Sequence, residues 1–90
     1  MNFDYNIEKN KQLKESRGIN FEDVIKAVKN KRVIKDFKHY NIKKYPNQKL
    51  LIVEIDNYAY VAPYVVDKIR KVKFLKTVYP DHDVTKKYLR

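Results

Sequence analysis

The sequence has 90 residues and a formal net charge of +10, because 21 lysines and arginines outnumber 11 aspartates and glutamates. This length predicts one domain, residues 1–90, and a content of 43% apolar residues is too high for a disordered chain. The absence of cysteine, with only two histidines and one glycine, excludes a disulfide framework, a convincing zinc site and glycine-rich phosphate loops, so we expect no cofactor.

The first third of the chain predicts two helices. Asn6 is a good N-cap for a helix over residues 7–17, and Gly18 is placed to end that helix in the left-handed conformation. A second helix begins after Asn20 and carries apolar residues at helical spacing, which we expect to face the core: Phe21, Val24, Ile25 and Val28. Residues 2–6 alternate between apolar and polar, which suits either a short edge strand or an aromatic anchor.

The rest of the chain predicts four strands and a short helix. Residues 48–65 read as a hairpin that turns at Asp56-Asn57 and is apolar on both faces, so it must lie in the centre of a sheet that is covered on both sides. Residues 32–37 and 72–79 supply the outer strands, and residues 84–89 supply the helix. We therefore expect an α+β fold with N-terminal helices packed on a four-stranded antiparallel sheet and a short C-terminal helix.

The charge is the strongest functional signal in the sequence. A small domain this basic suits a polyanion such as RNA, whose phosphates release counterions when lysines neutralise them. The plain alternative is a lysine-rich surface that only keeps the protein in solution. No apolar run approaches the ~20 residues of a membrane helix, and the first residues do not resemble a signal peptide. We therefore expect a cytoplasmic protein with no membrane partner.

Two stretches carry motifs with a recognisable spacing. The first contains Phe3-Asp4-Tyr5-Asn6, then Lys9, then Arg17-Gly18-Ile19-Asn20-Phe21-Glu22. The second is the predicted strand of residues 74–79, followed by a short polar turn and residues 85–88. Together they resemble the BrnT-type toxins. Tyr5 stands where that family usually has Trp, and His82 lies nearest the place of an Arg that follows the family's last strand.

The resemblance implies a RelE-like fold and an mRNA interferase, a ribonuclease toxin of a type II toxin–antitoxin system that cleaves RNA without a metal. It also implies an acidic antitoxin of the ribbon-helix-helix type as protein partner. Operator DNA would be reached only through that antitoxin.

Metal-free RNA cleavage needs a group that takes the 2′-hydroxyl proton, a group that protonates the 5′-oxygen, and cations around the phosphorane. His39 and His82 are the candidate proton carriers, because histidine changes its charge near neutral pH. Lys76 is the candidate catalytic cation. The candidates for binding substrate phosphates are Arg17, Lys43, Lys44 and Arg70, and the tyrosines available to stack bases are Tyr40, Tyr45 and Tyr79.

Each of these residues also has a plainer interpretation. A histidine in a turn is usually structural, a single lysine is usually only solvated, and Arg17 stands where it can interact with the C-terminal end of its own helix. Two function classes therefore stay open. One is a ribonuclease toxin held by an acidic partner. The other is a non-catalytic basic module, either a nucleic-acid binder or a degenerate toxin homologue that binds a protein.

Overall fold

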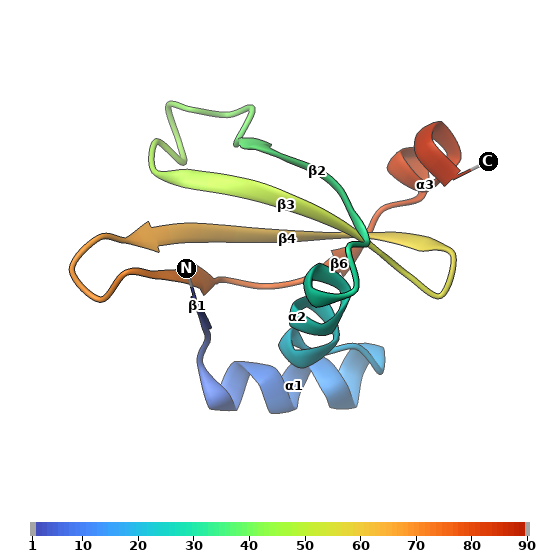
Figure 1. Cartoon of the computed structure of the whole chain (residues 1–90), viewed down its shortest axis with the longest axis horizontal. Helices are drawn as coiled ribbons and strands as arrows, with labels where there is room; N and C mark the ends of the chain where they lie inside the picture. Colours follow the sequence, from blue (N-terminus) through green and yellow to red (C-terminus); the bar gives the residue numbers. More distant parts are fainter. Residues whose placement is uncertain (1, 90) are drawn as a thin grey trace.

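An antiparallel hairpin occupies the middle of the fold and is flanked by strands on both sides (Figure 1). It consists of β3 (Gln48–Ile55) and β4 (Tyr58–Asp67). This computed structural model describes residues 2–89. The expected turn at Asp56-Asn57 is confirmed, with Ile55 opposite Tyr58 on its two sides. The two turn residues have φ angles of 53° and 62°, the left-handed conformation that a two-residue hairpin turn requires.

Within residues 2–89, four further strands complete a sheet of six. β2 (Val33–Lys38) pairs with β3, and β5 (Val72–Leu75) pairs with β4, both in the antiparallel direction. β1 (Asn2–Asp4) lies parallel to β5, and β6 (Tyr79–Pro80) pairs with β4 beyond the end of β5. The resulting order is β1-β5-β4-β3-β2, so β1 and β2 form the two edges.

The expected sheet of four antiparallel strands is wrong in two respects. β1 adds a parallel strand, and the expected strand over residues 72–79 is divided into β5 and β6. The division follows from Pro63 in β4. Its carbonyl accepts the N–H of Lys76 at 2.8 Å, but its own nitrogen carries no hydrogen with which to continue the ladder.

Two helices precede β2, as expected. α1 (Ile7–Arg17) begins at Asn6, whose side chain accepts a backbone N–H of the first turn. It ends at Gly18, whose φ of 70° is the left-handed conformation expected of a C-terminal cap. α2 (Phe21–Lys29) begins with a complete capping box at Asn20. Both helices are therefore started by local side-chain chemistry.

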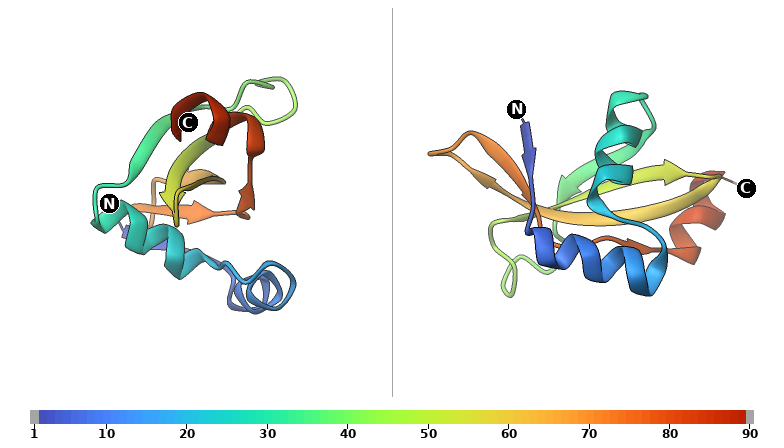
Figure 2. Two further views of the ribbon diagram at one scale, coloured as in Figure 1. Left: turned by 90° about the vertical axis from the view of Figure 1, so that its right-hand side faces the viewer. Right: turned by 90° about the horizontal axis from the view of Figure 1, so that it is seen from below.

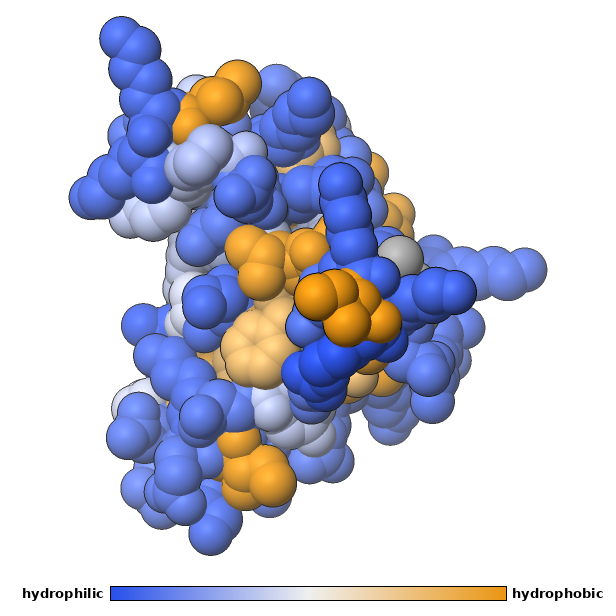
Figure 3. Space-filling view, turned by 90° about the vertical axis from the view of Figure 1, so that its left-hand side faces the viewer, coloured by the Kyte–Doolittle hydropathy of each residue, from blue (hydrophilic) through white to orange (hydrophobic). Residues whose placement is uncertain are grey.

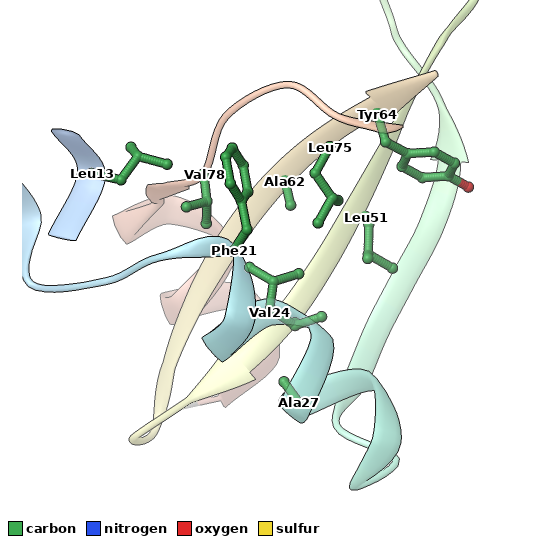
Figure 4. Close-up of a cluster of buried hydrophobic side chains, with 10 residues drawn as sticks. Leu13, Phe21, Val24, Ala27, Leu51, Ala62, Tyr64, Leu75 and Val78 are labelled. Carbon is green, nitrogen blue, oxygen red and sulfur yellow. The ribbon is translucent and has the colours of Figure 1, made fainter. Parts of the chain in front are cut away.

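α1 and α2 cover one face of the sheet, and α3 (His82–Leu89) covers part of the other (Figure 2). The three helices and the mixed sheet confirm the expected α+β class. Of the stripe predicted for α2, Phe21 and Val24 are buried, whereas Ile25 and Val28 are only partly buried. The buried residues of this main core, most of them visible in Figure 4, are Leu13, Phe21, Val24, Ala27, Leu51, Val53, Ala62, Tyr64, Leu75 and Val78.

The second core is smaller and lies between the sheet and α3. Its buried residues are Leu50, Ile52, Ala59 and Val61, against which Val84 and Leu89 of α3 pack. The hydroxyl of Thr85 accepts the N–H of Ala59 at 2.9 Å, which fixes α3 near the β3–β4 turn. The opposite end of this sheet face has no helix above it (Figure 1). Among residues 2–89, no helix is long and apolar enough to cross a membrane.

Candidate nucleic-acid interface

The open face is the part of the sheet that α3 leaves uncovered. It presents side chains from β2 to β6 and from the segment after β5: Phe37, Gln48, Val65, Phe74, Lys76 and Tyr79. Strand alternation puts these side chains on one side, since Phe37 pairs with Leu50 and Tyr79 pairs with Val61 of the second core. Phe37, Phe74 and Tyr79 are only partly buried, so part of each ring remains accessible to a ligand.

Lysines lie over the aromatic rings of the open face. The Nζ of Lys76 is 5.5 Å from the centre of the Phe74 ring, and the Nζ of Lys35 is 4.9 Å from that of Phe37. Asp36 stands between Lys35 and Phe37 in β2. Its side chain points to the opposite face, where it accepts a hydrogen bond from the hydroxyl of Tyr64. The open face thus combines aromatic rings with cations, a combination that suits RNA bases and phosphates.

The loop between β2 and β3, residues 39–47, adjoins the open face. His39 is buried at its start, with 9% of its surface exposed. Its backbone N–H donates to the carbonyl of Gln48, and its Nδ1 accepts the backbone N–H of Asn41, each at 3.0 Å. In the neutral ring the proton therefore sits on Nε2. These contacts give His39 a structural role in the loop, where the sequence suggested proton transfer.

The same loop carries several of the predicted RNA-binding residues. The ring centre of Tyr45 lies 4.5 Å from that of His39, and the Nζ of Lys44 lies 5.3 Å from the Tyr45 ring. Lys43 and Lys44 are both exposed. Figure 3 views the molecule from the end that holds this loop and the β4–β5 turn, and it shows apolar side chains surrounded by hydrophilic ones.

Tyr79 links the loop to the open face. Its ring packs against the second core, and burial raises the pKa of its hydroxyl. Tyr40 of the loop and Asp81 raise that pKa further, because each lies close enough to repel a tyrosinate. Tyr79 therefore keeps its proton at neutral pH and can donate a hydrogen bond to an anion.

A hollow of about 500 Å³ lies at the base of the loop. It is lined by Phe37, Lys38, Pro46, Asn47, Gln48 and Lys49. Another hollow, of about 460 Å³, lies between α2 and the β3–β4 turn and is lined in part by Asp23, Glu54 and Asp56. Three carboxylates make the second hollow the poorer place for a phosphate. The first is lined by two lysines and by no carboxylate, although the Nζ of Lys49 lies 3.9 Å from the carboxylate of Asp36.

His82 lies far from His39. It is the first residue of α3, and its Nδ1 is 3.5 Å from the hydroxyl of Tyr58, beside the β3–β4 turn. His39 adjoins the other end of β3, a strand of eight residues that spans roughly 25 Å. One phosphodiester cannot contact both rings, so the two histidines do not form the acid–base pair that the sequence suggested.

Arg17 and Arg70 both make structural contacts. The guanidinium of Arg17 donates to the carbonyl of Val78, which ties the end of α1 to the segment before β6. Arg70, in the β4–β5 turn, forms an ion pair with Asp4 of β1, and its hydrogen bond lowers the pKa of that carboxyl. The open face and its loop therefore contain neither of the predicted arginines.

Sequence reasoning did not single out Phe37 and Phe74. Each stands two residues from a lysine, Lys35 or Lys76, and this spacing puts ring and cation on the same face of a strand. The spacing is a signal in the sequence. It gains meaning only when the register shows that both strands turn these residues to the same side of the sheet.

Comparison with known proteins finds no match to this chain among family models, curated proteins or solved structures. The functional interpretation therefore depends on the geometry of the open face and the loop. Cations, accessible rings and a protonated phenol together favour a polyanion that also exposes bases.

Proposed function

We propose that this protein is a cytoplasmic ribonuclease toxin with a RelE-like fold, similar to the BrnT-type toxins, and that RNA binds across the open face and the loop. The observation that supports this most is that a lysine lies over an aromatic ring both on the open face, at Lys76, and in the adjoining loop, at Lys44 next to the exposed Lys43. The lysines supply phosphate binding and the rings supply base contacts. The motifs around the two N-terminal helices support the same class.

Cleavage in this proposal depends more on cations than on histidine. Attack of the 2′-oxygen on phosphorus forms a 2′,3′-cyclic phosphate and breaks the bond to the 5′-oxygen, through a phosphorane that carries extra negative charge. The 2′-hydroxyl gives its proton to solvent water, and the departing 5′-oxygen takes one proton from solvent water. Lys76 stabilises that charge, and protonated Tyr79 donates a hydrogen bond to a phosphate oxygen. His39 orders the loop beside them. The proposed step is metal-independent.

A toxin of this kind needs a partner that masks its basic surface. We propose an acidic antitoxin of the ribbon-helix-helix type, which alone contacts operator DNA. Complementary charge speeds the encounter of two such proteins, and apolar contacts at the centre of their interface slow dissociation.

The test is expression without the partner, together with RNA cleavage by the purified protein. Wild type should stop growth and cleave single-stranded RNA. Lys76→Gln should lower the cleavage rate about 10²- to 10³-fold, because it removes one group that stabilises the phosphorane. Lys11→Gln, at an exposed position of α1, is the matched control and should cleave like wild type. Equal rates for wild type and Lys76→Gln would exclude the proposed site.

A second function fits the separation of His39 from His82. A non-catalytic RNA-binding module needs the cations and rings of the open face but no pair of proton carriers. Such a protein would bind RNA without cleaving it, and its expression would leave growth unchanged. The same two assays therefore distinguish the two functions.

A further inference from the structure

Tyr40 exposes 82% of its surface. The residues on both sides of it, His39 and Asn41, are held by backbone hydrogen bonds. His39, before it, is bonded to Gln48. Asn41, after it, donates to His39 through its N–H and accepts the N–H of Tyr45 at 2.9 Å through its carbonyl. These bonds fix the turn of the chain on both sides of Tyr40. The loop therefore presents this ring to solvent on an ordered backbone.

Other rings support Tyr40 from within the loop. The ring centre of Tyr40 is 4.6 Å from that of His39, and the ring centre of His39 is 4.5 Å from that of Tyr45. The rings are tilted by 33° and 38° to one another, and Lys44 lies over Tyr45 at the end of the series. Since Tyr40 is so exposed, most of its ring is left for one more aromatic group.

The surroundings of Tyr40 suit a nucleobase better than an uncharged aromatic ligand. Lys43 and Lys44 follow it closely in the loop and are exposed, so they can neutralise phosphates next to a stacked base. Tyr79 of the open face is near enough to Tyr40 for their hydroxyls to interact electrostatically. A base inside a duplex is stacked on both sides by its neighbours and offers no free face, whereas an unpaired base does.

We propose that Tyr40 is a stacking platform for one unpaired base of RNA, and that the RNA must be single-stranded at this nucleotide. Lys43 and Lys44 bind the adjacent phosphates, while His39 and Tyr45 support the ring from behind. This inference rests on the proposed function, because the open face beside the loop receives the rest of the RNA.

The experiment measures binding of a fluorescein-labelled 2′-O-methyl oligouridine, which resists cleavage because its 2′-oxygen carries a methyl group. The full chain of wild type should bind the single strand, and Tyr40→Ala should weaken binding about 5- to 100-fold, the range for one base–aromatic stack. Tyr40→Trp should bind at least as tightly as wild type. Tyr88→Ala is the matched control, because Tyr88 is also exposed, at 41%, and has a lysine 5.3 Å from its ring, but lies on α3. Its affinity should equal that of wild type.

The same oligonucleotide annealed to its complement is the second probe. Wild type should bind this duplex more weakly than the single strand, and Tyr40→Ala should not change duplex binding. An unchanged affinity of Tyr40→Ala for the single strand would overturn the platform and leave the proposed RNA cleavage intact. If Tyr40→Ala loses affinity equally for the single strand and the duplex, the platform is also overturned, because Tyr40 would then contact the phosphate backbone. Failure of wild type to bind single-stranded RNA would overturn the platform and the proposed function together.

Discussion

A single tyrosine hydroxyl organises the charges on the helix-covered side of the sheet. Tyr64 is fully buried, and its hydroxyl donates to the carboxylate of Asp36 at 2.7 Å. The Nζ atoms of Lys49 and Lys73 lie 3.9 Å and 4.0 Å from the same carboxylate, and both lie near the Tyr64 ring. This arrangement holds Asp36 on the side away from the open face, which leaves the cations there without an opposing charge from β2.

The substitution Tyr64→Phe should lower the free energy of unfolding by about 1–2 kcal/mol, because it removes a hydrogen bond to a charged group. Urea unfolding at neutral pH measures the change. Tyr58→Phe is the control, since the Tyr58 hydroxyl makes only a 3.5 Å contact with His82 and should matter little. If Tyr64→Phe lowers the free energy of unfolding no more than Tyr58→Phe does, the assigned role of the Tyr64 hydroxyl is contradicted.

The same hydroxyl should make stability depend on alkaline pH. Burial, and then the hydrogen bond to Asp36, raise the pKa of Tyr64 above its ordinary value of 10.0. A group whose pKa is raised by folding stabilises the protein fully below the unfolded-state pKa, and this contribution is lost as pH rises through the folded-state value. The difference in free energy of unfolding between wild type and Tyr64→Phe should therefore be constant from neutral pH to about pH 10 and shrink above that pH. Urea unfolding of both proteins over this range gives the difference, and an advantage that grows above pH 10 would contradict the prediction.

α2 meets the sheet along a line of residues three apart, in which Phe21 and Val24 have no exposed surface. Val24→Asp should unfold the domain, because an unpaired charge in the core destabilises it by several kcal/mol. Ile25→Asp, on the partly buried flank of α2, should keep a cooperative unfolding transition at lower stability. Circular dichroism and thermal unfolding distinguish these results. A folded Val24→Asp variant beside an unfolded Ile25→Asp variant would show that α2 is rotated differently about its axis.

The helices and the central hairpin could be predicted because their signals act within a few residues. Asn6 and Gly18 bound α1, and the turn at Asp56-Asn57 sets the register of the hairpin. The edges of the sheet could not be predicted in this way. The pairing of β1 with β5 joins segments far apart in the chain, and the gap between β5 and β6 depends on Pro63 in another strand.

In the candidate site, too, the residues close in sequence could be predicted to lie together, whereas those on distant segments could not. His39, Lys43, Lys44 and Tyr45 lie together because one loop contains them all. Chemistry alone groups His82 with His39, whereas the length of β3 separates the two. Phe37 and Phe74 could not be recognised as neighbours of this site before the strand register was known. The exposure of Tyr40 likewise depends on how the loop closes rather than on residue type.

The net charge of +10 should make RNA affinity depend strongly on salt concentration. If three or four lysines of the open face and loop contact phosphates, the logarithm of affinity should fall against the logarithm of salt concentration with a slope of about −2 to −3. The double variant Lys43→Gln/Lys44→Gln removes two of those contacts and should make the slope shallower by about 1.4. Fluorescence anisotropy with the uncleavable oligouridine measures both slopes.

The control for this prediction is Lys11→Gln/Lys14→Gln, which removes the same charge from exposed positions of α1. It should keep the wild-type slope, because α1 lies on the face opposite the proposed RNA path. Equal slopes for the two double variants would show that only total charge matters and that the loop makes no specific phosphate contacts.

The parallel pairing at the sheet edge also affects the order in which the chain can fold. Asn2 pairs with Val72, and Arg17 bonds to the carbonyl of Val78, so β1 and α1 reach their final places only after residues near position 78 are available. Contacts this distant in sequence form slowly, because the entropy of a long loop is lost before they can form. During translation the β3–β4 hairpin can form early, whereas β1 and α1 must wait for segments that are still unmade. β1 and α1 are made before their partners and are thus among the last segments of the domain to become fixed.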